Sequence, residues 1–241
     1  RFLESKTFMG FLYHPDIRLR PHGQSGPLAS SQSTFKDYFS RQAHFWEKMA
    51  LTRARFVCGN PEVEPFLEQV KEEILFSAPC TQEELESILS MRQKIEREKS
   101  RSEGLKAGRG GLVDVEFLAQ TLVLHYGHEC KNLRKTSTLE VLRISNEEGL
   151  MPEQDVQWLL DSYLFLREVE NRLRIVNNVS MDALPDKPEE MEKLTRRYAL
   201  KLDTEKYTPE TFLDMINFHT ERVRKIFDAF FDRLIQESNA V

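Results

Sequence analysis

The sequence of 241 residues is long enough for one large domain or two small ones. Hydrophobic residues make up 40% and charged residues 30%, which is typical of a globular protein and excludes extensive disorder. The net charge of -5 provides no broad positive surface, so we expect no nucleic-acid partner.

The cysteine spacing and the length of the apolar runs indicate in which cellular compartment the protein is located. The three cysteines, Cys58, Cys80 and Cys130, are too few and too scattered for a disulfide framework, and none forms a Cys-x-x-Cys zinc motif. No apolar run approaches the roughly 20 residues that a membrane span requires, and the start lacks the layout of a signal peptide. We therefore expect a cytoplasmic protein that has no membrane partner.

The first convincing element is a strand within residues 7–21. Ile17 and Leu19 alternate with Asp16, Arg18 and Arg20, and side chains of a strand alternate between its two faces. The three charged residues are therefore predicted to share one face. Proline and glycine residues then predict a loop over residues 21–27.

From residue 34 onward, apolar residues recur at helical spacing, which predicts about eight helices. The first is predicted as one long helix over residues 34–58, with Thr34 and Asp37 as a capping box. Later starts are expected near residues 60, 81, 112, 137, 152, 188 and 209, and Glu84 completes a capping box with Thr81. The charged residues 96–103 are expected to form a solvated face or a loop.

The residues Asp16, Arg18 and Arg20 are the first candidate site. A carboxylate can hold Mg²⁺, and guanidinium groups can neutralise phosphate oxygens. The alternative is a salt-bridge network at a strand edge, which spacing alone favours because such neighbours are common on surfaces.

A glycine-rich turn at residues 106–111 is the second candidate. Lys106 and Arg109 accompany three glycines directly before a helix, a pattern typical of a turn that cradles phosphate with backbone N–H groups. The turn lacks the Walker A spacing. Asp114 and Glu116 suit the helix start on structural grounds, and their spacing places them on different faces. Structural and phosphate-binding interpretations are therefore equally open.

The third candidate is an arginine on an apolar stripe. Arg53 and Trp46 both fall on this stripe, and an inward Arg needs a carboxylate or phosphate partner. The stripe itself is expected to be mostly core. No histidine or cysteine is assigned to catalysis, and His219 is expected to be a satisfied core histidine.

Three segments in order, residues 12–28, 46–55 and 106–120, together resemble the glutamine synthetase adenylyltransferase family, also called glutamate-ammonia-ligase adenylyltransferase. The resemblance implies that residues 1–33 are the end of a nucleotidyltransferase α/β domain, contributing its last strand or strands. A mainly α, bundle-like helical domain would follow over residues 34–241, with the helix at 34–58 packing on the nucleotidyltransferase part.

The resemblance also implies a chemistry. Asp16 would be a catalytic, metal-binding carboxylate beside the Mg²⁺ ions that bridge ATP phosphates. The nucleotide or phosphate contacts would come from Arg18, Arg20, Lys106 and Arg109. The family's other two metal carboxylates lie in a Gly-Ser-x-x-Asp-x-Asp pattern that these 241 residues lack, so we expect this chain alone to be inactive.

The implied activity is transfer of AMP from ATP to a tyrosine of glutamine synthetase, which regulates nitrogen assimilation. Residues 46–51 and the pair Asp114 and Glu116 favour the C-terminal, adenylylating half of the family's proteins. One alternative is the half that removes AMP by phosphorolysis. Another is a noncatalytic helical module that docks glutamine synthetase or the PII signal protein.

Overall fold

The computed structural model describes residues 8, 10, 19–99, 104–177, 183–200 and 207–238. Within these ranges there are nine α-helices, two short 3-10 helices and no strand, which confirms the mainly α prediction. The strand predicted around Asp16 and Arg18 lies outside the described residues. Leu19 and Arg20, at its expected end, form a bend instead of continuing a strand.

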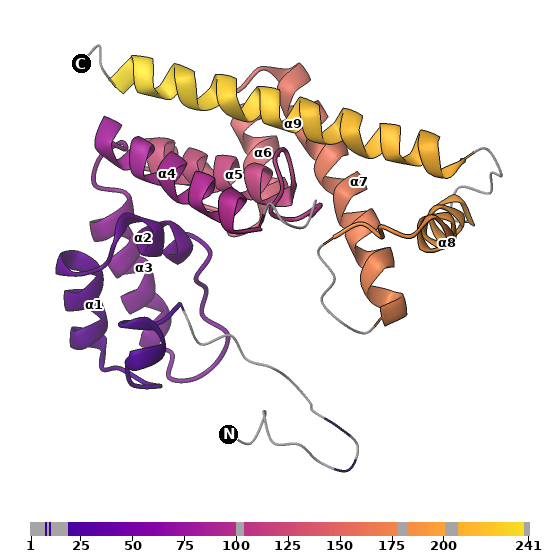
Figure 1. Ribbon diagram of the computed structural model, residues 1–241. Coiled ribbons are helices and arrows are strands. Elements are labelled where there is room, and N and C mark those ends of the chain that lie inside the picture. Colours follow the sequence, from indigo (N-terminus) through magenta and orange to yellow (C-terminus); the bar gives the residue numbers. More distant parts are fainter. Residues whose placement is uncertain are drawn as a thin grey trace.

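Three short helices form a group at one end of the molecule (Figure 1). They are α1 (Gln32–Arg41), α2 (Phe45–Leu51) and α3 (Val63–Leu75). The longer α4 (Gln82–Lys99) and α5 (Leu112–Tyr126) connect this group to the rest. The remaining helices are α6 (Thr138–Glu147), α7 (Glu153–Asn177), α8 (Pro188–Ala199) and α9 (Pro209–Ser238).

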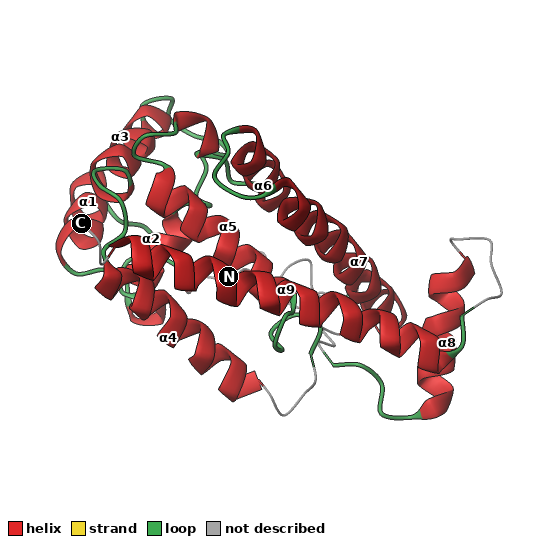
Figure 2. Ribbon diagram, turned by 90° about the horizontal axis from the view of Figure 1, so that it is seen from above, coloured by secondary structure: helices red, strands yellow, loops and turns green. Residues whose placement is uncertain are grey.

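Helix α5 is the centre of the bundle and contacts α2, α4, α6, α7 and α9. Its core includes Leu112, Val115, Leu118 and Leu122, each with no exposed surface. Seen from above, α9 runs along the bundle over α5 and reaches α8 at its N-terminal end (Figure 2). Apart from Tyr126 at its end, the partly exposed positions of α5 recur at helical spacing and form one stripe, which comprises Val113, Glu116, Phe117 and Gln120.

The single long helix predicted over residues 34–58 is wrong. Helix α1 ends at Arg41, and α2 begins at Phe45 after a break. The Glu47 carboxylate accepts hydrogen bonds from the His44 backbone N–H (2.9 Å) and the Tyr38 hydroxyl (2.6 Å). These bonds stabilise a new helix start and fold α2 against α1, because a helix N-terminus needs acceptors for its free N–H groups.

The predicted helix starts have mixed outcomes. The capping box at Thr34 and Asp37 is wrong, because α1 begins earlier and the Thr34 N–H donates to the hydroxyl of its cap, Ser31 (3.2 Å). The box at Thr81 and Glu84 is confirmed, since each backbone N–H donates to the other side chain at 3.0 and 3.3 Å. Across the described residues, no helix is both long and apolar enough to cross a membrane.

Candidate functional site

The turn after residue 20 is held by its own arginine. The Arg20 Nε donates to the Gly23 carbonyl (2.9 Å), and Nη2 donates to the Gln24 carbonyl (3.2 Å). His22 has a left-handed backbone with φ of 63°, which is uncommon for a residue with a Cβ. Arg20 therefore clamps a tight turn, while Asp16 and Arg18, the other members of the predicted site, lie outside the described residues.

This turn is attached to the first two helices. The His22 ring packs edge-on against the Tyr38 ring, with 4.6 Å between ring centroids. Burial raises the pKa of Tyr38, and the neighbouring Glu47 carboxylate raises it further, so the hydroxyl stays protonated and donates to Glu47. A continuous chain of contacts thus joins the bend at Leu19 to α1 and α2.

A pocket of about 290 Å³ lies where the bend meets these helices. Most of its lining is apolar, and its charged members are Glu47 and Arg53. Leu19, which lies between Arg18 and Arg20 of the predicted site, also lines it. The pocket is therefore part of the junction between the N-terminal segment and the helices.

Arg53 connects this pocket to the centre of the bundle. Its Nη1 lies 3.7 Å from Oε2 of Glu116 on α5. The predicted position of Arg53 and Trp46 on an inward apolar stripe is wrong, because Arg53 lies in an exposed turn after α2 and Trp46 is 37% exposed. The Glu116 carboxylate also accepts from the Tyr163 hydroxyl (3.1 Å) and pairs with Arg167 on α7. Arg167 pairs in turn with the buried Glu170 (2.8 Å). Glu116 therefore joins three separate parts of the fold.

The backbone of the glycine-rich turn is occupied by its own hydrogen bonds. The Gly108 N–H donates to the Gly104 carbonyl (2.8 Å), and the N–H groups of Gly111 and the first α5 residues also donate within the turn. These donors are Gly111, Leu112, Val113 and Asp114. An anion at this helix N-terminus would need those donors free. The geometry therefore favours the structural interpretation of the turn.

The buried Asp114 side chain stabilises the same glycine-rich turn. Its fully buried carboxylate pairs with Arg92 of α4, accepts from the Gly110 N–H (2.7 Å) and lies 3.7 Å from Arg224 of α9. Burial raises the pKa of Asp114, and the charge and hydrogen bond of Arg92 oppose that shift. Arg92 also donates to the Gly108 carbonyl (2.8 Å). Asp114 is thus a structural centre for α4, α5 and α9.

The predicted phosphate-binding cations are not brought together. Arg109 is 67% exposed and lies 3.6 Å from Asp228 on α9, whereas Arg20 binds its own turn beside α1. Helix α9 lies away from α1 (Figure 1). Lys106 is half-buried, and its side chain forms no ion pair with the described residues. Phosphate contact by these side chains stays a prediction.

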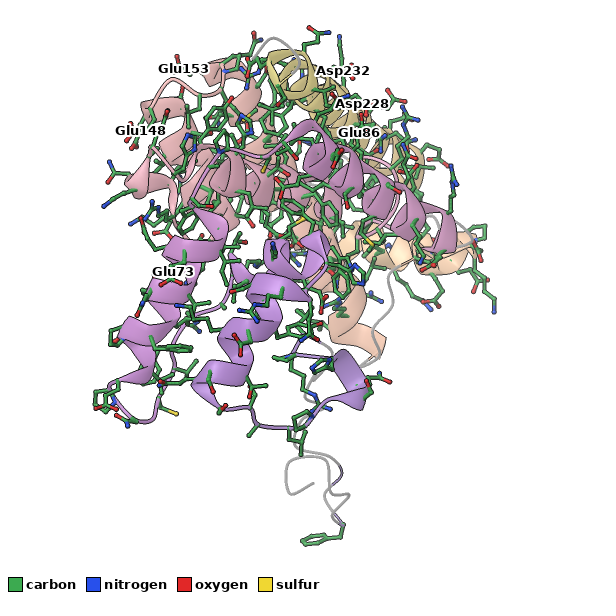
Figure 3. All side chains as sticks on the ribbon, turned by 90° about the vertical axis from the view of Figure 1, so that its left-hand side faces the viewer. Glu73, Glu86, Glu148, Glu153, Asp228 and Asp232 are labelled. Atoms are coloured by element: carbon green, nitrogen blue, oxygen red, sulfur yellow. The ribbon has the colours of Figure 1, made fainter. Side chains whose placement is uncertain are left out.

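Acidic side chains form no metal site in the part of the chain that the structure describes. Glu73 on α3 and Glu148 after α6 lie well apart from Asp228 and Asp232 on α9 (Figure 3). No group of three His, Cys, Asp or Glu residues there could hold a metal ion. The predicted metal ligand, Asp16, falls outside those residues.

Sequence reasoning missed most partners of the two central acids. Arg92 fell on the inward face of its predicted helix, which was a signal that it needed a buried acid. Tyr163 and Arg167 are 47 and 51 residues from Glu116, so no local spacing could pair them. Glu96, expected on a solvated face or in a loop, lies within α4 and pairs with Arg224 (3.0 Å).

Comparisons with known proteins divide the chain into two matched parts. A family model described as glutamate-ammonia ligase adenylyltransferase matches residues 1–70. A second, described as GlnD PII-uridylyltransferase, matches residues 89–231. The two matches meet near the connection between α3 and α4.

Three curated relatives each bear the name bifunctional glutamine synthetase adenylyltransferase/adenylyl-removing enzyme. The protein from Psychromonas ingrahamii is 34% identical over 200 residues, which cover 80% of this chain and 20% of the relative. Those from Aromatoleum aromaticum and Nitrosomonas europaea are 31% and 30% identical, over 99% and 95% of this chain and 25% and 24% of their own lengths. The chain spans a quarter or less of these relatives.

Proposed function

The chain belongs to the glutamine synthetase adenylyltransferase family, and we propose that it is part of an enzyme that transfers AMP from ATP to a tyrosine of glutamine synthetase. The observation that carries the proposal is the 31% identity to a bifunctional relative over 99% of the chain. Because the relatives are at least four times as long, we assign the activity to a longer parent protein.

The proposal divides the chain at residue 33. Residues 1–33 would end a nucleotidyltransferase domain, and residues 34–241 would form the helical domain that follows it. The ring contact of His22 with Tyr38 crosses this boundary and supports a close association of the two parts, and the hydrogen bond of Tyr38 to Glu47 extends the connection to α2. They attach the turn after the first segment directly to α1 and α2.

Asp16 is the residue to which we assign the chemistry. It would hold Mg²⁺, or assist deprotonation of the tyrosine hydroxyl that attacks the α-phosphorus of ATP. When bound, Mg²⁺ would offset the charge that develops on the phosphoryl oxygens. The candidates for phosphate contact are Arg18, Arg20, Lys106 and Arg109. Of these, Arg20 has one buried nitrogen, Nη1, with no hydrogen-bond partner.

The direction of the reaction is a second part of the proposal. The segment at residues 46–51 and the pair Asp114 and Glu116 resemble the adenylylating half, so we assign AMP addition to this chain's parent site. The relatives' printed name also includes adenylyl removal, which keeps phosphorolysis as the alternative. The name of the second family model supports PII as a partner.

The test is an assay of the intact parent protein with glutamine synthetase, ATP and Mg²⁺. We expect mass spectrometry to find one AMP on a tyrosine of glutamine synthetase. A matched reaction starting from adenylylated glutamine synthetase and phosphate measures removal. A parent that binds glutamine synthetase without ATP but catalyses neither reaction would favour a noncatalytic docking module.

A further inference from the structure

We propose that the pocket between α1 and α2 is the subsite for the adenosine part of the nucleotide, and that Arg53 at its rim contacts a phosphate. This inference rests on the proposed function, because the occupant is the ATP from which AMP would be transferred. It adds a nucleotide contact from the helical part of the chain, which neither the family matches nor the relatives' names assign.

The walls of the pocket suit a flat, largely apolar ring. Phe35 and Phe39 on α1, whose ring centroids lie 4.7 Å apart, line the pocket together with Leu51 from α2. Ala50 and Ala54 also line it, and their small side chains leave space for a ring. Small-molecule sites are typically apolar clefts with a few polar groups that fix orientation.

Arg53 supplies a cation that has unused hydrogen-bonding capacity. Its side chain is 43% exposed, and its one ion pair is the 3.7 Å contact with Glu116 within the described residues. A guanidinium carries five N–H donors, so most of them are free for a phosphate, whose geometry they match in pairs. Glu116 is a positioning residue here, because Arg167 and Tyr163 hold its carboxylate in place.

The second charged group of the pocket, Glu47, forms hydrogen bonds with α1 and with the start of α2. Glu47 directs one carboxylate oxygen to the Tyr38 hydroxyl (2.6 Å) and the other to the His44 N–H (2.9 Å). Its negative charge is therefore stabilised by α1 and by the start of α2, where the helix dipole favours an acid.

The position of the pocket in the sequence favours a nucleotide as its occupant. Leu19 lines it and follows Asp16 by only three residues. Three residues span at most about 11 Å of extended chain between Cα atoms, so the proposed catalytic residue is close to the pocket lining along the sequence. Because the proposed catalytic residue precedes a lining residue of this pocket so closely in the sequence, a nucleotide is the occupant that the proposed function supplies.

The test uses competitive inhibition of AMP transfer by the intact parent, with adenosine and tripolyphosphate as separate probes. Arg53→Ala should raise the inhibition constant of tripolyphosphate and the KM for ATP about tenfold, since a hydrogen bond to a charged group contributes that much. It should leave the inhibition constant of adenosine unchanged. Ala54→Leu fills the apolar space. It should raise the inhibition constant of adenosine and leave that of tripolyphosphate unchanged.

Two controls separate binding from folding. Arg143→Ala removes an exposed arginine on α6 and should change neither constant. Arg53→Lys keeps the charge and should recover part of the tripolyphosphate affinity. If a pocket variant changes the inhibition constants of adenosine and tripolyphosphate equally and also lowers the Tm, its role is structural and the inference is overturned. Inhibition constants that stay unchanged in both Arg53→Ala and Ala54→Leu would also overturn it.

Failure of the proposed function is a different result. If the unmodified parent adds no AMP to glutamine synthetase, the proposed function fails, and equilibrium dialysis of adenosine against this chain then tests the pocket. Binding that Ala54→Leu weakens, and Arg143→Ala does not, would support an adenosine site. Equal binding by both variants, or no binding, would overturn it.

Discussion

The Asp114 carboxylate and the Arg92 guanidinium form an ion pair in which the side chains are 0% and 1% exposed. This pair joins the start of α5 to α4, and Arg224 adds a contact from α9 at 3.7 Å. The glycine-rich turn is bonded to the same two side chains through Gly108 and Gly110. The turn is therefore the point where three helices of the bundle are held together.

Removing one partner of this pair should strongly destabilise the protein. Arg92→Met leaves the Asp114 charge buried, and we expect the free energy of unfolding to fall by about 3 to 5 kcal/mol. Urea unfolding followed by circular dichroism measures this change. Arg92→Met with Asp114→Leu removes both charges and should recover part of the loss. A decrease below about 1 kcal/mol for the single variant would contradict the buried pair.

Two glycines with a positive φ allow a matched comparison of the effect of adding a Cβ atom. Gly110 and Gly149 have φ of 72° and 69°, so Ala at either costs about 1 to 2 kcal/mol of backbone strain. A Cβ at Gly110 would also collide with the Thr220 carbonyl of α9, whereas a Cβ at Gly149 meets nothing. Thermal unfolding should therefore show a much larger fall in Tm for Gly110→Ala. Equal falls would contradict the close approach of α9 to the turn.

The helices could largely be predicted because apolar spacing and caps are local properties. Pro152, Pro188 and Pro209 correctly marked the starts of α7, α8 and α9. The break between α1 and α2 was missed because its cause is tertiary. The Glu47 carboxylate is held by the Tyr38 hydroxyl from the preceding helix, and the apolar stripe continues through the break.

The candidate site was less predictable for a related reason. Spacing correctly separated Asp114 from Glu116, because residues two apart on a helix point in different directions. It could not distinguish a phosphate-cradling turn from one whose N–H groups bond internally, since both need glycines. The carbonyls of Gly104 and Leu105 occupy those groups only once the turn has folded.

Cysteine reactivity should differ sharply within the chain. Burial raises the pKa of Cys80 to about 12, whereas Cys58 is exposed. Since the thiolate is the nucleophile, iodoacetamide at pH 8 should modify Cys58 first and leave Cys80 largely unmodified until the protein unfolds. Peptide mass spectrometry over time measures both. Equal rates for the two residues in the folded protein would contradict the buried position of Cys80.

Stability should fall as the pH drops from 7 towards 5. Burial lowers the pKa of His219 from its ordinary value of 6.5, and the Ser162 hydroxyl bonds its Nδ1 atom (2.9 Å). In this pH range the unfolded chain binds a proton that the folded protein does not, which favours unfolding as the pH falls. His219→Gln should therefore reduce this loss of stability, which urea unfolding at pH 7 and pH 5 measures.

His125 gives a second instance of the same effect, since burial lowers its pKa too. The double variant His125→Gln with His219→Gln should therefore show a smaller pH dependence than either single variant. An unchanged slope between pH 7 and 5 in the double variant would show that these histidines do not titrate differently in the folded and unfolded states.

The central claim is that the segment around Asp16 carries AMP addition in the parent protein. Its most direct test is incorporation of AMP from labelled ATP into glutamine synthetase by Asp16→Asn, with Asp37→Asn, an exposed acid of α1, as the matched control. We predict that Asp16→Asn abolishes addition while phosphorolytic removal and binding of glutamine synthetase persist, and that Asp37→Asn retains both activities. Loss of removal alone, with addition intact, would contradict the assignment.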